Sequence, residues 1–200
     1  MGETRIIDSA LLVKGTLTAP VAGALTNANL VTPSIGGVAL GSTAAEIDAV
    51  ADISAQAVIA ANAATLTVTA ILHAGRVIAF GKTDGTTVTL PAATGTGHIY
   101  RFVISITATS NNNIIKVANA TDVMNGSICV QQDTDADGTA QTWRADVGDD
   151  TMTFAGAAGT GGIVGGYIEC VDYKSGFWSC RAYIQSGGGA EVTPFSATVS

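Results

Sequence analysis

The stretch His98-Ile-Tyr-Arg-Phe-Val-Ile-Ser-Ile-Thr-Ala-Thr109 places Tyr100, Phe102, Ile104 and Ile106 at every second position. Alternation of this kind is the pattern of a β-strand that buries one face and exposes the other. The sequence therefore predicts a half-buried strand over residues 98–109, and it predicts further strands wherever the same period returns.

The two-residue period returns along most of the chain after residue 63. Asp84-Gly85, Asn111–Asn113 and Asp137-Gly138 stand between successive strands and predict hairpin turns. Many short strands with regular turn signals indicate an all-β domain, either a β-sandwich or a jelly-roll-like fold. The predicted strands cover residues 64–70, 76–80, 86–90, 98–109, 114–118, 126–132, 139–147, 151–154, 163–173 and 177–185.

Residues 1–55 differ in composition from the rest of the chain. Between Gly15 and Gly75 the chain has no Lys or Arg, and Pro20 and Pro33 interrupt long regular elements. The segment has too little apolar bulk to fold alone, so we expect an extended N-terminal arm.

One short helix is expected at the end of this arm. Thr43-Ala-Ala-Glu46 fits the capping box, which predicts a helix near residues 43–51. The β domain then covers residues 56–185. Residues 186–200 form a Gly-rich linker and a C-terminal tail, which is either frayed or docked as an added strand.

The low charge of the chain indicates assembly. Charged residues make up 12 % of the sequence, against roughly 25 % in ordinary soluble proteins. A chain with so little surface charge is expected to cover part of its surface with copies of itself or with a partner. The predicted interface residues are the large apolar side chains of the arm: Ile6, Ile7, Leu11, Leu12, Val13, Leu17, Leu25, Leu30, Val31 and Ile35.

Charge and hydropathy also exclude some partners. The net charge is −7, and nucleic-acid affinity comes mainly from Lys and Arg that neutralise phosphates, so we expect no nucleic-acid partner. No apolar run is long enough for a membrane span. The N-terminus lacks the pattern of a signal peptide, because Glu3 and Asp8 interrupt it. Synthesis in a cytoplasm is expected, with no membrane partner.

An acidic turn is the one candidate metal site. Asp133, Asp135 and Asp137 alternate before Gly138, and such carboxylates can converge on Ca²⁺. The position where an EF-hand has its bidentate Glu is occupied by Arg144. The alternatives are a Ca²⁺ site at a hairpin tip and a solvated turn without any cofactor.

Two cysteines are expected to face each other across a hairpin. A three-residue loop at residues 174–176, with Gly176 in a left-handed conformation, sets Cys170 opposite Cys180 and Tyr173 opposite Phe177. The pair is either a disulfide or two buried free thiols, and a reducing cytosol favours thiols.

No catalytic residues are predicted. His73, expected in an apolar strand, and His98, at a strand start, have no second ligand or nucleophile at a useful spacing. Four aromatic residues offer an alternative function, because they would form a platform for a sugar ring: Trp143, Tyr173, Phe177 and Trp178.

Two stretches resemble bacteriophage virion proteins. Leu40-Gly-Ser-Thr-Ala-Ala-Glu-Ile-Asp48 is similar to an element that recurs in phage structural and fibre proteins. Val88-Thr-Leu-Pro-Ala-Ala-Thr-Gly-Thr-Gly-His-Ile-Tyr-Arg-Phe-Val103, with Asn113-Ile-Ile-Lys-Val117, resembles a segment of small capsid-associated proteins. The resemblance covers 30 of the 200 residues and carries no catalytic residue.

The resemblance implies a structural role in a virion. It predicts a non-enzymatic head decoration protein on the capsid exterior, which stabilises the capsid by cementing neighbouring capsomers. Its partners would be the major capsid protein and itself, as a homotrimer at threefold points of the capsid. The alternative is a receptor- or carbohydrate-binding module of a head or tail fibre.

Overall fold

The computed structural model describes residues 34–35, 38–39, 58–132, 140–156, 160–187 and 192–199. The chain divides into two units, Met1–Ile47 and Asp48–Ser200. In the first unit, β1 (Ser34–Ile35) and β2 (Val38–Ala39) form an antiparallel pair. The backbone of Ile35 lies in β1; the other predicted interface residues and the predicted helix near 43–51 lie outside the described residues.

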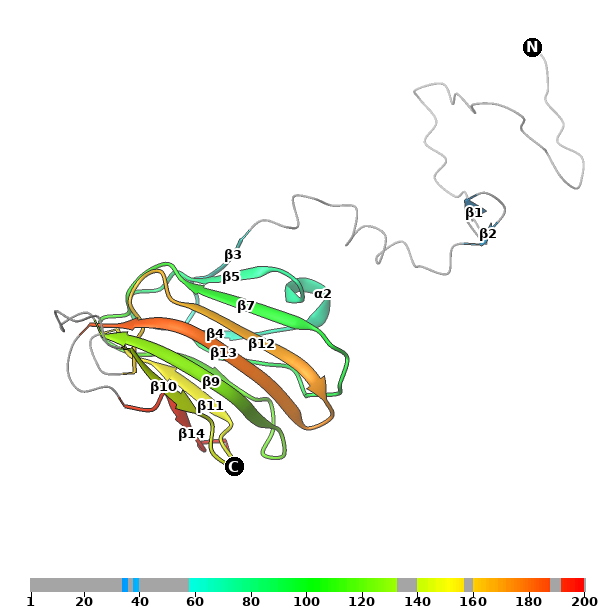
Figure 1. Ribbon diagram of the computed structural model, residues 1–200. Coiled ribbons are helices and arrows are strands. Elements are labelled where there is room, and N and C mark those ends of the chain that lie inside the picture. The colour runs from blue at the N-terminus through cyan, green and yellow to red at the C-terminus, as the bar shows by residue number, and fades with distance from the viewer. Residues whose placement is uncertain are drawn as a thin grey trace, which may run out of the picture. The chain divides into compact units, whose positions relative to one another are not determined.

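The second unit is an all-β sandwich of two mixed sheets, which confirms the predicted fold class (Figure 1). Its seven-stranded sheet has the order β10-β9-β13-β12-β7-β5-β3, and its five-stranded sheet has the order β14-β11-β8-β6-β4. The first sheet contains β3 (Ile59–Ala61), β5 (Val77–Phe80), β7 (Ile99–Ile104), β9 (Val123–Gln132), β10 (Ala140–Arg144), β12 (Tyr167–Lys174) and β13 (Phe177–Ser186). The second contains β4 (Thr65–Thr67), β6 (Thr87–Thr89), β8 (Asn113–Lys116), β11 (Thr151–Phe154) and β14 (Phe195–Ser196).

Residues 58–117 wind between the two sheets in three coils, and we call them the coil half. Each coil gives one strand to each sheet, so β3, β5 and β7 are parallel neighbours in one sheet and β4, β6 and β8 in the other. Parallel neighbours need a long crossover connection, which is a helix in most proteins. Here the crossover is the strand of the opposite sheet.

Residues 123–199 form longer ladders, and we call them the ladder half. β9 pairs antiparallel with β10, and β12 pairs antiparallel with both β7 and β13. β13 runs parallel to β9 and so lies in the middle of its sheet. The C-terminal tail returns to the five-stranded sheet, where β14 pairs with β11 and Phe195 is buried.

The core lies between the sheets and follows the predicted alternation. Tyr100, Phe102 and Ile104 are buried, whereas Ile106, beyond the end of β7, is 39 % exposed. Trp178 is fully buried and meets the edge of Tyr100, with ring centroids 5.7 Å apart. Large side chains of this kind supply most of the burial that stabilises a sandwich.

Two predicted hairpins are wrong. Asp84-Gly85 connects β5 to β6, and residues 105–112, which contain Asn111, connect β7 to β8, but each of these strand pairs is divided between the two sheets. The glycine is still required locally, because Gly85 has a φ of 75° and a Cβ atom there would collide with the carbonyl oxygen of Asn112. The turn signal was therefore correct, and the inferred strand partner was not.

The predicted strand over 64–70 is also too long. It ends at Thr67, and α2 (Ala70–His73) follows, so His73 lies in a helical turn and not in a strand. The Thr69 N–H donates to Nδ1 of His73 at 3.1 Å. The side chain of the last residue of α2 therefore binds a backbone donor at its start. Burial lowers the pKa of His73; the contact of its Nδ1 with the Thr69 carbonyl oxygen opposes this shift, and the charge of Arg76 adds to it.

Candidate functional site

One candidate surface is the open end of the coil half, formed by β3, β4 and α2; we call it the first-coil edge. β3 and β4 are the terminal strands of their sheets. Residues 53–75 contain no Asp, Glu, Lys or Arg. Val58, Ile71 and Leu72 are 58 %, 84 % and 56 % exposed. Edge strands are usually protected by charge, and exposed apolar patches mark interaction sites, so this edge is suited to a protein partner.

A second candidate surface is the outer face of the seven-stranded sheet. The register of five adjacent strands aligns five side chains across it, and we call them the arginine row: Arg101, Glu169, Arg181, Ser127 and Arg144. Arg101 donates to Glu169 at 3.1 Å. Within the described part of the chain, Arg181 and Arg144 make no ion pair. The row thus presents three guanidinium groups and one carboxylate.

Tyrosines flank the arginine row. Tyr167 and Tyr183 are paired on neighbouring strands and are 38 % and 72 % exposed. The Tyr167 hydroxyl donates to Glu169 at 3.3 Å, and burial is the main cause that raises the pKa of Tyr167. On the other side of the row, Tyr173 accepts a hydrogen bond from Asn125 at 3.1 Å. These contacts hold two of the three exposed rings in place.

Two hollows open beside the row. One, of about 530 Å³, lies at its β10 end and is lined by Asn125, Ser127, Arg144 and Asp146 among others. The other, of about 240 Å³, is lined by Cys129, Gln131, Tyr183 and Gln185 among others. Both are open and mixed in polarity, which suits a shallow contact with a polar ligand better than enclosure of a small apolar molecule.

The outer face of the five-stranded sheet has different chemistry. Thr65 pairs with Thr87, and Thr67 pairs with Thr89. Lys116 is the cation of this face and is half-buried. Threonine suits a pleated surface, so this face is explained by strand formation alone and serves as an internal comparison.

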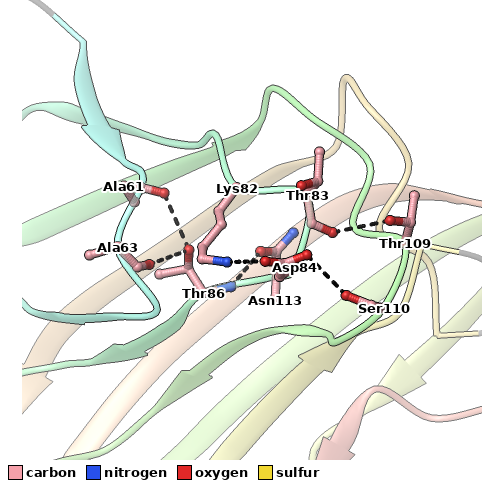
Figure 2. A network of polar contacts seen from close by, with 9 residues as sticks. All are labelled: Ala61, Ala63, Lys82, Thr83, Asp84, Thr86, Thr109, Ser110 and Asn113. Atoms are coloured by element: carbon pink, nitrogen blue, oxygen red, sulfur yellow. Dashed lines mark hydrogen bonds and ion pairs between the residues drawn. The ribbon is translucent and has the colours of Figure 1, made fainter.

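The polar contacts at one corner of the coil half are structural (Figure 2). The Thr86 hydroxyl is 2.9 Å from the carbonyl oxygen of Ala63 and 3.2 Å from that of Ala61, and the Thr86 N–H donates to Asn113 at 3.1 Å. Beside them, Lys82 pairs with Asp84 at 2.6 Å. The three Thr86 hydrogen bonds connect consecutive coils of the sandwich. Their donors and acceptors are used within the protein, so they explain the network as a structural one.

A buried carboxylate joins the two halves. Asp172 of β12 accepts backbone hydrogen bonds from Gly95 at 2.6 Å, Thr96 at 3.1 Å and Thr94 at 3.2 Å, and a hydroxyl hydrogen bond from Thr96 at 2.7 Å. Burial, the largest single influence, acts to raise the pKa of Asp172; the hydrogen bonds from Thr96, Gly95 and Thr94 together outweigh it and lower that pKa. The loop 94–96 already has its anion, so it is not a free phosphate site.

The predicted pairing of the cysteines is confirmed, whereas Phe177 pairs with Lys174 and not with Tyr173, because the register shifts between Asp172 and Lys174. Cys170 and Cys180 are paired across β12 and β13, and Gly176 in the loop has a φ of 79°. Both thiols are free and fully buried, with sulfur atoms 3.6 Å apart. A hydrogen bond with Cys180, together with burial, raises the pKa of Cys170 well above its usual value. The Cys170 thiol is consequently a poor nucleophile in this state.

Other predicted site residues are distributed differently. Asp133, Asp135 and Asp137 lie outside the described residues, and within those residues no three His, Cys, Asp or Glu side chains gather as metal ligands. The proposed sugar platform is wrong as a set: Trp178 is buried and Trp143 packs against the core, whereas Tyr173 and Phe177 share the outer face.

Sequence reasoning missed the arginine row. The two-residue period places Arg101, Glu169 and Arg181 on outward positions of their own strands, and this was the available signal. Their alignment depends on the register between strands distant in sequence.

Comparison with protein-family models, curated proteins and solved structures found no match. In the described part of the chain, no helix has the length and hydrophobicity needed to cross a membrane.

Proposed function

We propose that this protein is a non-catalytic structural component of a bacteriophage virion, which attaches to the capsid exterior as a homo-oligomer. The observation that carries the assembly part is the first-coil edge: two terminal strands and a helical turn without any charged residue. The virion part rests on the resemblance of residues 40–48, 88–103 and 113–117 to phage proteins.

The first-coil edge supports assembly through two kinds of contact. Among the described residues, β3 and β4 each have a neighbouring strand on one side only, so a strand of a partner can pair with the backbone groups of the other side. Ile71 and Leu72 of α2, which follows β4 in the chain, add exposed apolar area, and such area contributes about 25 cal/mol per Å² when it is removed from water. The weakly charged segment 1–55 leads into this edge along the chain, so the proposed interface continues into it.

Light scattering on the full chain tests the assembly. The purified protein is expected to be an oligomer, with a trimer as the expected size. The double substitution Ile71→Asp with Leu72→Asp should shift it towards the monomer, because charge would have to be buried at the interface. Val147→Asp is the matched control, since Val147 is fully exposed in a loop elsewhere.

A monomeric full-length protein at micromolar concentration contradicts the assembly. Mass spectrometry of purified particles from the phage that encodes the chain tests the virion part separately.

A second function, receptor or carbohydrate binding, is favoured by the arginine row and its tyrosines.

A further inference from the structure

The arginine row has a spacing set by the sheet. Arg101, Arg181 and Arg144 occupy every second strand of the order β7-β12-β13-β9-β10. Neighbouring strands lie about 4.8 Å apart, so consecutive arginines start roughly 10 Å apart on the backbone. A ligand that matches the row therefore carries its negative charges at wide and regular intervals.

This spacing disfavours nucleic acid. A nucleic-acid strand carries one phosphate per roughly 3.4 Å, which is about three times denser than the row. The strand between each pair of arginines contributes Glu169 or Ser127, so the intermediate positions hold an acid or a neutral hydroxyl. A densely charged polyanion would meet repulsion at Glu169 and gain nothing at Ser127.

The placement of charge also disfavours a protein partner on this face. Protein interfaces have an apolar centre with a polar rim. Here the charged row crosses the middle of the sheet, and apolar side chains such as Val103 and Val171 lie on either side of it. A second copy laid face to face would set three arginines and one glutamate against the same set, with a net repulsion.

The tyrosines point to a ligand with flat, partly apolar rings. Tyr167 and Tyr183 lie two residues along their strands from Glu169 and Arg181, so they form a neighbouring row roughly 7 Å away. A chain of sugar rings laid across the strands would contact both rows at once. Arginine pairs with carboxylates in a fixed bidentate geometry, and aromatic rings pack against the apolar faces of sugars.

We propose that the outer face of the seven-stranded sheet binds an acidic polysaccharide, laid across the strands along the arginine row. Arg181 and Arg144 bind its carboxylates, and Tyr167 and Tyr183 pack against the sugar rings that lie over β12 and β13. The hollow beside Arg144 accommodates the substituents at one end. This site goes beyond the proposed structural role and does not depend on it, because the purified chain is sufficient to test it.

Binding of defined polymers to the full-length protein provides the test. Hyaluronan carries a carboxylate on alternate sugars, and polygalacturonate carries one on every sugar; neutral dextran is the uncharged control. We expect hyaluronan to bind at low salt, polygalacturonate to bind more weakly because its carboxylates are more closely spaced than the arginines, and dextran not to bind. The double variant Arg181→Gln with Arg144→Gln should raise the Kd at least tenfold. Lys116→Gln, which removes a cation from the opposite face, should leave the Kd unchanged.

Glu169→Gln should change the Kd in the opposite direction from the arginine substitutions. It removes the one acid of the row and releases Arg101, so binding should tighten several-fold, an effect that damage to the fold cannot produce. Circular dichroism checks that each variant is folded. The proposal is overturned by absence of binding to hyaluronan, by equal or tighter binding of polygalacturonate, by equal loss in the Lys116 variant, by weaker binding in the Glu169 variant, or by tighter binding of single-stranded DNA or poly-glutamate.

Discussion

The coil half and the ladder half of the sandwich contribute different polar side chains to the hydrogen bonds that hold loops in place. In the coil half, neutral groups contact backbone carbonyls: the Thr86 hydroxyl reaches Ala63, and the Ser105 hydroxyl donates to Phe80 at 2.7 Å. The ladder half supplies buried carboxylates that accept backbone hydrogen bonds: Asp172 anchors loop 94–96 of the coil half, and Asp150 anchors residues 198–199 of the ladder half.

This difference teaches how pH acts on the fold. A hydroxyl donates over the whole accessible pH range, whereas a carboxylate accepts fully only when it is ionised. Charge-assisted hydrogen bonds are also stronger than neutral ones. The hydroxyl contacts of the coil half and the carboxylate contacts of the ladder half are therefore expected to respond differently to acid. Substitution of one carboxylate is also expected to cost more stability than substitution of one hydroxyl.

The largest expected loss of stability is at Gly126, where β9 and β13 of the ladder half approach each other closely. Gly126 has a φ of 136°, and a Cβ atom there would collide with the carbonyl oxygen of Cys180. Gly126→Ala should lower the free energy of unfolding by at least about 4 kcal/mol, measured by urea denaturation. Gly165→Ala is the control, because Gly165 has a φ of 96° with open space around it. Equal losses in the two variants would show that the close approach of β9 and β13 is unimportant.

Asp172→Asn should have the next largest effect. The amide keeps the shape but removes the charge that accepts hydrogen bonds from residues 94–96, so we expect a loss of about 3 kcal/mol at neutral pH. Thermal unfolding followed by circular dichroism measures it. A loss below that of Thr86→Val would contradict the stronger role assigned to carboxylates.

The pH dependence of stability sharpens the comparison. The pKa of Asp172 is lower in the folded protein than its ordinary value, so the unfolded chain binds the proton first. The stabilisation that ionised Asp172 provides is complete above its pKa in the unfolded chain, about 3.9, and is lost as the pH falls through its pKa in the folded protein. Asp172→Asn should therefore flatten the acid limb of the stability curve, whereas Thr86→Val should shift the curve without changing its slope.

Thr86→Val isolates the neutral network of the coil half. The variant keeps the shape and loses the hydroxyl contacts with Ala61 and Ala63, so we expect a loss of about 1–2 kcal/mol. Thr109→Val serves as its control, because that hydroxyl is exposed and lies 3.4 Å from the Thr83 oxygen. Chemical denaturation of both variants should separate them.

The smallest effect is expected at Lys82 and Asp84. The hydrogen bond from Lys82 is the largest cause that lowers the pKa of Asp84, followed by the one from Ser110. Lys82→Ala should raise that pKa in an NMR titration and leave the melting temperature almost unchanged, because exposed ion pairs add little stability. A large fall in the melting temperature would mean that this corner contributes more than its exposure suggests.

Much of the fold was predictable from the sequence, whereas strand partners were only partly so. The two-residue period located β7, β11, β12 and β13, because burial of one face acts on each strand locally. The pairing of β12 with β13 also followed from a short loop with a glycine.

The coils were not predictable in this way. Asp84-Gly85 favours a tight turn whether the next strand returns to the same sheet or crosses to the other one. Partner choice depends on the packing of both sheets, and no local pattern records it. The arginine row shares this limit, since each of its residues comes from a different strand.

The central place of β13 governs when the sandwich can close during synthesis. β13 lies between β9 and β12, yet it is the last long strand of the described chain to leave the ribosome. Until it emerges, β9 and β12 each lack a neighbour, and their open edges are exposed to nascent chains of the same kind. Completion of this domain therefore waits for the synthesis of β13, and slower translation of the codons for residues 177–186 would lengthen the period in which the domain is vulnerable to misassembly.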